Sequence, residues 1–181
     1  MKILIINGIA DDPKYMEYER EFENIINSQS INTLLYFKLR DLNINFCTGC
    51  WNCWLKTPGI CSLKDDQEKI LKYIPHVDHI LFLSPIILGY ESFLIKKFKD
   101  RFIPTVQPFI RIYKGEEHHY PRYKNMPKLS FIGIEDELTT IDDIAIIKET
   151  YKRVSLNFNS DFYKFYTSKD IGGVKNVLSN F

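Results

Sequence analysis

The sequence has no excess of charge of either sign. It contains 24 Lys and Arg residues against 23 Asp and Glu residues, which gives a formal net charge of +1. Binding to nucleic acid or to an anionic membrane surface draws on an excess of positive charge. The balance therefore gives no reason to expect either partner, and we expect a protein that binds no nucleic acid.

Long hydrophobic runs are also missing. The stretch 79–90, which lacks Asp, Glu, Lys and Arg, is shorter than the roughly 18 apolar residues of a membrane span, and Pro85 interrupts it. The apolar run 3–6 is shorter than a signal-peptide core, which takes about 7 to 15 residues. These features predict a cytoplasmic protein with no membrane partner, in a compartment that keeps thiols reduced.

Cysteine is scarce, and all four cysteines fall in one short window: Cys47, Cys50, Cys53 and Cys61. A disulfide framework would spread its cysteines to link distant segments, and a chain of 181 residues has a core that needs no such links. Thiolates at two-residue spacings are ligands for iron–sulfur clusters or for zinc. We therefore expect a metal or cluster site. Tetrahedral zinc and metal-free, redox-active thiols remain alternatives to a cluster.

Strand-like and helix-like segments alternate along the chain. Short apolar runs predict strands at 2–6, 33–37, 79–83, 129–134 and 162–166, and helical spacing predicts helices near 15–26, 65–74, 93–102, 140–154 and 171–178. The segment GEEHHYPRY, residues 115–123, is expected to be a polar loop. This alternation predicts an α/β fold, a flavodoxin-like three-layer sandwich with a five-stranded parallel sheet in the order 2-1-3-4-5. We expect residues 1–181 to form a single such domain with a cysteine-rich loop at 46–64.

The topology also predicts where a ligand binds. In such a sheet the loops after strands one, two and three emerge at the carboxyl edge, and the ligand binds at the switch point between strands one and three. The cysteine window follows strand two. We therefore expect it next to the loop after strand one, in a redox pocket shared with the proline-containing loop 84–91.

Two segments carry a resemblance to a known family. The cysteine window reads FCTGCWNCWLKTPGICSLKDD, and the segment around the third strand reads ILFLSPIILGYESFLIKKFKDRFIP. Over about residues 1–135 the chain resembles the iron–sulfur flavoprotein branch of the flavodoxin-like, NADPH-dependent FMN reductase family. The resemblance implies FMN beside a 4Fe-4S cluster, with Cys47, Cys50, Cys53 and Cys61 as cluster ligands. It implies flavin contacts from Asn7, Ser84, Pro85, Ile86, Ile87, Leu88 and Gly89.

The loop after the first strand departs from the family pattern. Family members carry Ser, Thr and Asn there to grip the FMN phosphate, whereas this chain reads NGIADDPKYMEYE. Pro13 removes an amide donor, and Asp11 and Asp12 add negative charge. Losing two or three hydrogen bonds to phosphate, at roughly 1.5 to 3 kcal/mol each, removes about 3 to 9 kcal/mol of binding energy. That loss weakens FMN binding at least about a hundredfold, although Lys14 offers a compensating charge.

Together these features predict a flavin-dependent oxidoreductase or electron-transfer protein. By resemblance it would be an NAD(P)H-dependent FMN reductase that takes electrons from a nicotinamide donor or a redox partner and forms a homo-oligomer. We expect no catalytic side chain, because the cofactors carry the chemistry. Trp51 and Trp54 are expected to pack on the domain or to form a subunit contact. The alternative is a non-enzymatic relative that has lost FMN binding and keeps the cysteine loop as a structural zinc site or a protein-interaction surface.

Overall fold

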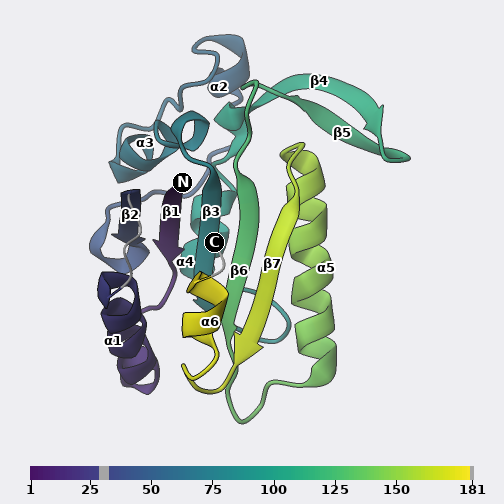
Figure 1. Ribbon diagram of the computed structural model, residues 1–181. Helices are drawn as coiled ribbons and strands as arrows, with labels where there is room; N and C mark the ends of the chain where they lie inside the picture. The colour runs from purple at the N-terminus through teal and green to yellow at the C-terminus, as the bar shows by residue number, and fades with distance from the viewer. Residues whose placement is uncertain (29–32, 180–181) are drawn as a thin grey trace.

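A computed structural model describes residues 1–28 and 33–179 (Figure 1). Within these residues five parallel strands form one sheet: β1 (Lys2–Asn7), β2 (Thr33–Lys38), β3 (His79–Pro85), β6 (Lys128–Ile134) and β7 (Phe162–Ser168). Their order is β2-β1-β3-β6-β7. In register, Ile5 of β1 lies between Tyr36 and Leu81, and Phe82 of β3 lies beside Phe131 of β6. The predicted α/β fold with a parallel sheet is therefore confirmed.

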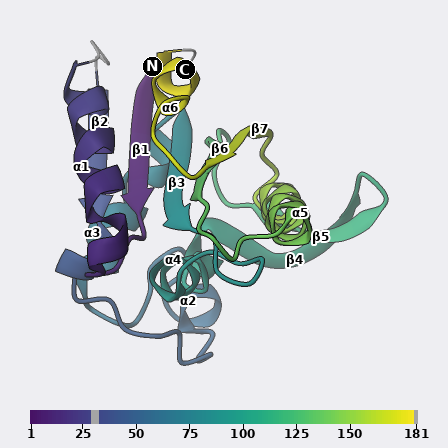
Figure 2. The ribbon, with the colours of Figure 1, turned by 90° about the horizontal axis from the view of Figure 1, so that it is seen from below.

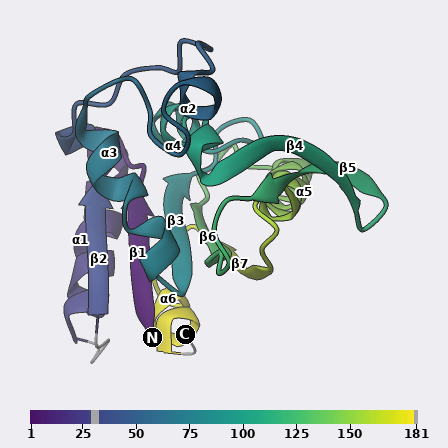
Figure 3. The same ribbon diagram turned by 90° about the horizontal axis from the view of Figure 1, so that it is seen from above.

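A two-stranded hairpin corrects the predicted strand order and the expected loop at 115–123. Strands β4 (Val106–Tyr113) and β5 (Glu116–Pro121) pair antiparallel and lie outside the parallel sheet. The observed order is thus 2-1-3-6-7 instead of 2-1-3-4-5, because two strands intervene in the chain before β6. Lys114 and Gly115, both with positive φ, form the two-residue turn that a hairpin favours. Figures 2 and 3 show the hairpin extending past α5.

Helices cover both faces of the sheet. Helices α1 (Pro13–Ser28) and α6 (Val174–Ser179) pack on one face, and α3 (Asp66–Leu71), α4 (Phe93–Lys99) and α5 (Ile141–Asn157) pack on the other. Successive strand residues point to opposite faces, so Ile3 and Ile5 meet the first pair of helices while Leu4 and Ile6 meet the second set. No helix in the described part of the chain is both long and apolar enough to cross a membrane.

Polar caps fix where three helices begin. The Asp65 side chain accepts a hydrogen bond from the amide of Gln67 at the start of α3, and Ser92 accepts from Ile95 at the start of α4. Thr140 and Asp143 form a reciprocal capping box at the start of α5. The caps at Asp65 and Ser92 fix segments that border the two regions expected to bind cofactors.

Candidate cysteine pocket and flavin site

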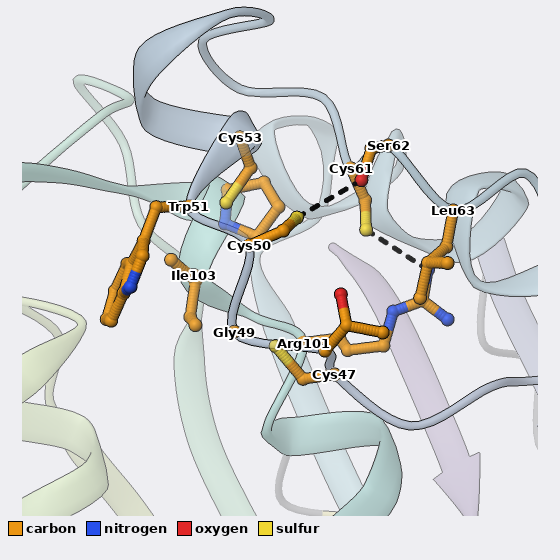
Figure 4. A pocket seen from close by; sticks show the side chains of 12 residues that line it. Cys47, Gly49, Cys50, Trp51, Cys53, Cys61, Ser62, Leu63, Arg101 and Ile103 are labelled. Carbon is orange, nitrogen blue, oxygen red and sulfur yellow. Dashed lines mark hydrogen bonds between the residues drawn. The ribbon is translucent and has the colours of Figure 1, made fainter.

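The structure brings the four predicted cysteines around one pocket. Cys47 and Cys50 come from the loop that leads into the short helix α2 (Asn52–Leu55), Cys53 lies in that helix, and Cys61 follows it. Figure 4 shows Cys50, Cys53 and Cys61 near one another, with Cys47 across the pocket from them. The thiol of Cys53 is buried, that of Cys61 is half-buried, and Cys47 and Cys50 are exposed. The remaining wall includes residues that follow α4.

The arrangement does not match a site for a single metal ion. Across residues 1–28 and 33–179, no group of three or more His, Cys, Asp and Glu side chains is placed to hold one ion. Structural zinc needs four ligands about 2.0 to 2.3 Å from a common point, so the geometry does not support zinc. The donor chemistry fits a larger thiolate-bound centre, because four thiols, which lie before, within and after α2 along the chain, surround one space.

Side-chain hydrogen bonds reach the sulfurs of Cys50 and Cys61. The hydroxyl of Ser62 lies 3.3 Å from the sulfur of Cys50. This contact, together with the backbone amide of Asn52, lowers the pKa of Cys50 to about 7. Burial has the opposite effect on Cys53 and raises its pKa. The pocket therefore stabilises a thiolate at its open side more than at its buried side.

Arg101 joins the pocket to the rest of the protein. Its side chain is only 1% exposed, and its Nη2 donates to the sulfur of Cys61 at 3.3 Å. Its Nη1 donates to Asp65 Oδ2 at 2.5 Å and to the carbonyl of Asn45 at 3.2 Å. Burial opposes ionisation of Asp65, but the hydrogen bonds from Arg101 and Asn45 outweigh it and lower the pKa of that carboxyl. Arg101 is not among the predicted site residues, although the segment ILFLSPIILGYESFLIKKFKDRFIP that carries the resemblance contains it.

The two tryptophans pack as part of the same loop. The indole N–H of Trp54 donates to the carbonyls of Ile103 and Val106, each at 3.0 Å. The rings of Trp51 and Trp54 stack with their centroids 5.0 Å apart, and the ring of His119 lies 5.0 Å from Trp54. Trp54 thus attaches the loop to the start of the hairpin, while Trp51 remains exposed.

The proline-containing loop is a tight turn with an exposed apolar tip. Ser84 is buried, and its hydroxyl oxygen accepts a hydrogen bond from the amide of Ser92 at 2.8 Å. Of the other predicted flavin contacts, Pro85, Ile86 and Gly89 are buried, and Ile87 and Leu88 are exposed. Leu88 and Gly89 both have positive φ, the backbone of a two-residue turn that Ile87 and Tyr90 close. The tip offers apolar surface on which a flat ring can lie.

Asn7 is committed to internal hydrogen bonds. Its Oδ1 accepts from the amide of Ile9, and its Nδ2 donates to Tyr36 and to Glu19. Arg40 binds both oxygens of Glu19, at 2.7 and 2.6 Å, and also donates to the carbonyl of Ile9. The structure therefore places Asn7 at the predicted edge, in a role that fixes the shape of the loop after β1.

The prediction that the cysteine window and the proline-containing loop share one pocket is wrong. The loop after β1 does meet the proline-containing loop, because the Ser92 hydroxyl donates to the carbonyl of Gly8 at 2.6 Å. Both loops lie at the start of α4, whereas the cysteine pocket is lined by Arg101, Ile103 and Pro104, beyond the end of α4. Seven helical residues, about 10 Å of helix, separate the two regions (Figure 1). The connection after β2 runs along α4 because Asn45 and Asp65 bind Arg101.

The residues present fit only part of FMN. The turn at 86–90 suits the isoalloxazine ring, since it combines exposed apolar side chains with backbone amides. The loop after β1 fits the phosphate poorly, because most of its amides already donate to acceptors within the protein and Asp11 and Asp12 add negative charge. The predicted site therefore fits the ring of FMN better than its phosphate.

Curated relatives are iron–sulfur flavoproteins, and no protein-family model matches the chain. An iron–sulfur flavoprotein of Methanocaldococcus jannaschii is 36% identical over 85 residues, which cover 47% of this chain and 42% of that protein. One from Archaeoglobus fulgidus is 31% identical over 114 residues, covering 56% and 48%, and one from Clostridioides difficile is 33% identical over 107 residues, covering 56% and 45%. The chain thus spans less than half the length of these relatives.

Solved structures show a similar fold at low sequence identity. An FMN-dependent NADH-azoreductase from Bacillus anthracis, in complex with FMN, has a TM-score of 0.58 and 13% identity, covering 92% of this chain and 86% of that one. An NAD(P)H:quinone oxidoreductase from Methanothermobacter marburgensis has a TM-score of 0.58 and 13% identity, covering 93% and 85%. The resemblance that the cysteine motif predicts, to the iron–sulfur flavoprotein branch of the flavodoxin-like FMN reductases, is confirmed.

Proposed function

We propose that this chain is a flavin-dependent oxidoreductase, an NAD(P)H-dependent flavin reductase that also carries a cysteine-bound iron–sulfur centre. The observation that carries the proposal is the gathering of all four cysteines around one pocket in a flavodoxin-like fold. The curated relatives are named iron–sulfur flavoproteins, and one structural neighbour holds FMN, which supports the same function. A non-enzymatic relative with a structural zinc site is not favoured, since the pocket lacks the geometry for one ion.

In this proposal Cys47, Cys50, Cys53 and Cys61 hold a 4Fe-4S cluster. Arg101 donates to the sulfur of Cys61, and Ser62 contacts that of Cys50. Hydrogen bonds to ligand sulfurs stabilise their negative charge and shift the potential of a bound cluster. The chain's own contribution is thus to position the thiolates and to set their electrostatic environment.

At the other end of α4, the turn formed by residues 84–90 is proposed to hold the flavin ring. Ile87, Leu88 and Tyr90 present apolar surface, and Pro85 and Ile86 fix the turn to the sheet. A bound flavin would accept hydride from a nicotinamide donor and release electrons singly. No side chain here needs to act as an acid or base, so positioning and water exclusion are the tasks of the protein.

We extend the proposal to a homo-oligomer that uses the cysteine loop as a contact. The loop exposes large apolar side chains at Phe46, Trp51 and Leu55. Such residues are typical of the buried centre of subunit interfaces. This apolar surface supports the proposal, and no Asp, Glu, Lys or Arg occurs in residues 46–55.

The test is anaerobic purification followed by metal and sulfide analysis and an absorbance spectrum. We expect about four iron atoms and four sulfides per chain, the content of one 4Fe-4S cluster, together with flavin bands after incubation with flavin. Cys61→Ser should lose the iron, while the control Thr48→Ser, in the same loop, should keep it. A colourless wild-type protein that contains zinc and does not oxidise NADH or NADPH in the presence of flavin would refute the proposal.

A further inference from the structure

Most backbone amides of the loop after β1 donate hydrogen bonds within the protein. The amides of Gly8, Ile9, Asp12, Lys14 and Tyr15 donate, in that order, to Leu83 O, Asn7 Oδ1, Ala10 O, Asp12 Oδ1 and Asp12 O, at 2.8, 2.8, 2.9, 3.0 and 3.0 Å. Pro13 has no amide hydrogen. A phosphate-binding loop at a helix start works by directing such amides at the anion. These five are already satisfied. The amides of Ala10 and Asp11 donate to no acceptor in the described part of the chain, but the amide of Asp11 lies beside that residue's own carboxylate.

An aspartate of the chain occupies the position that an anion would take. The carboxylate of Asp12 accepts from the amide of Lys14 in the first turn of α1, which is where a helix favours negative charge. Asp11 and Asp12 are both exposed at this edge. A phosphate brought to the start of α1 would therefore meet two carboxylates, and the amide of Lys14 there is already bonded.

The basic side chains near this loop are also engaged. Lys14 Nζ binds, at 2.8 Å, Oδ2 of Asp136, which lies in the loop after β6. Arg40 binds both oxygens of buried Glu19. Each cation is thus matched by a carboxylate, and binding a phosphate would mean separating one of these pairs.

The ring end of the site exposes apolar side chains instead of carboxylates at its tip. Leu88 is 84% exposed, and Ile87 and Tyr90 are also exposed at the tip of the turn. The amides of Leu88 and Gly89 donate to no acceptor in the described part of the chain. Apolar surface and free amides at one end, with two carboxylates and mostly bonded amides at the other, favour recognition of a flat heterocycle without its phosphate.

We infer that this chain binds flavins through the isoalloxazine ring and gains no affinity from the phosphate, so that riboflavin and FMN are equivalent, exchangeable substrates. The inference rests on the proposed flavin-reductase function and narrows its substrate class. A flavin held by its ring alone lacks the charge-assisted hydrogen bonds that retain FMN as a resident group. The flavin accordingly enters oxidised and leaves reduced, after accepting a hydride from NAD(P)H and a proton from solvent.

The test is titration of flavin-free protein with FMN and with riboflavin, followed by flavin fluorescence. We expect the two dissociation constants to agree within about threefold, because each phosphate hydrogen bond would otherwise contribute about tenfold or more. FMN binding more than threefold tighter would overturn the inference while leaving the proposed function intact. Failure of both flavins to bind would overturn the proposed function itself.

A pair of variants tests the electrostatic cause. Asp12→Asn keeps a side chain that can cap α1 and removes its charge, so FMN affinity should rise about threefold while riboflavin affinity stays the same. The control Asp161→Asn removes an exposed charge before the start of β7 and should change neither affinity. An equal rise for both flavins, or no rise for FMN, would overturn the electrostatic part of the inference.

Discussion

Replacing Arg101 with methionine is expected to destabilise the protein and loosen the cysteine loop. The side chains of Arg101 and Asp65 are each 1% exposed, and the variant leaves the Asp65 carboxylate buried without its cation. Removing one partner of a buried ion pair costs about 3 to 5 kcal/mol of unfolding free energy. The lower end applies here, since Asp65 still accepts hydrogen bonds from Asn45 and Gln67. We therefore expect a loss of about 3 kcal/mol.

Urea unfolding of the wild type, Arg101→Met, Asp65→Asn and the double variant measures this effect. Because the two side chains are in contact, the double variant should be more stable than the sum of the single losses predicts, by about 2 kcal/mol. Arg20→Met, which removes an exposed ion pair with Glu17, is the control and should leave the unfolding free energy nearly unchanged. A loss below about 1 kcal/mol in Arg101→Met, or additive losses in the double variant, would refute the reasoning.

Three further outcomes follow from other contacts. Lys99 and Glu91 form an ion pair at 2.8 Å, and their side chains are 9% and 2% exposed. Lys99→Met should therefore lower the unfolding free energy by about 3 kcal/mol, and adding Glu91→Met should restore much of that loss. Equal stability of the single and double variants would contradict this. The hydrogen bond from Lys14 lowers the pKa of Asp136 to about 2, below its ordinary 3.8, so its stabilisation is present above 3.8 and is lost as the pH falls through about 2. Lys14→Met should raise that pKa toward 3.8 in an NMR titration, and an unchanged value would argue against the ion pair. Trp54→Phe removes an indole donor shared by two carbonyls and should cost about 1 kcal/mol in urea unfolding, with no loss expected if the indole is not bonded.

The centre of the parallel sheet could be predicted because β1, β3 and β6 are buried on both faces. Residues 79–85 are all buried, so the third strand reads as a continuous apolar run with an unambiguous position. The hairpin could not be found in this way, since Phe109, Ile110 and Ile112 are exposed and give no alternation of buried and exposed residues. The pair Lys114-Gly115 was a usable signal, because a Gly at the second position suits a two-residue hairpin turn.

The cysteine pocket could be predicted in composition but not in position. Its four thiols come from one short window, so local spacing alone brings them together. The walls supplied by Ile103 and Pro104 come from a segment more than forty residues later and depend on tertiary packing. Likewise, the hydrogen bond from Asn7 to Glu19 depends on where α1 packs against the sheet, and no local sequence pattern predicts that position.

The location of the cysteine loop follows from the needs of one buried arginine. The connection from β2 to α3 is long enough to reach either end of α4, so its length does not decide where the cysteines lie. A guanidinium buried beyond the end of α4 requires acceptors, because an unpaired buried charge is costly. Asp65, the carbonyl of Asn45 and the sulfur of Cys61 supply them, and all three belong to this connection. Burial of Arg101 therefore holds the loop at the far end of α4, and the distance between the thiols and the turn formed by residues 84–90 follows from these contacts.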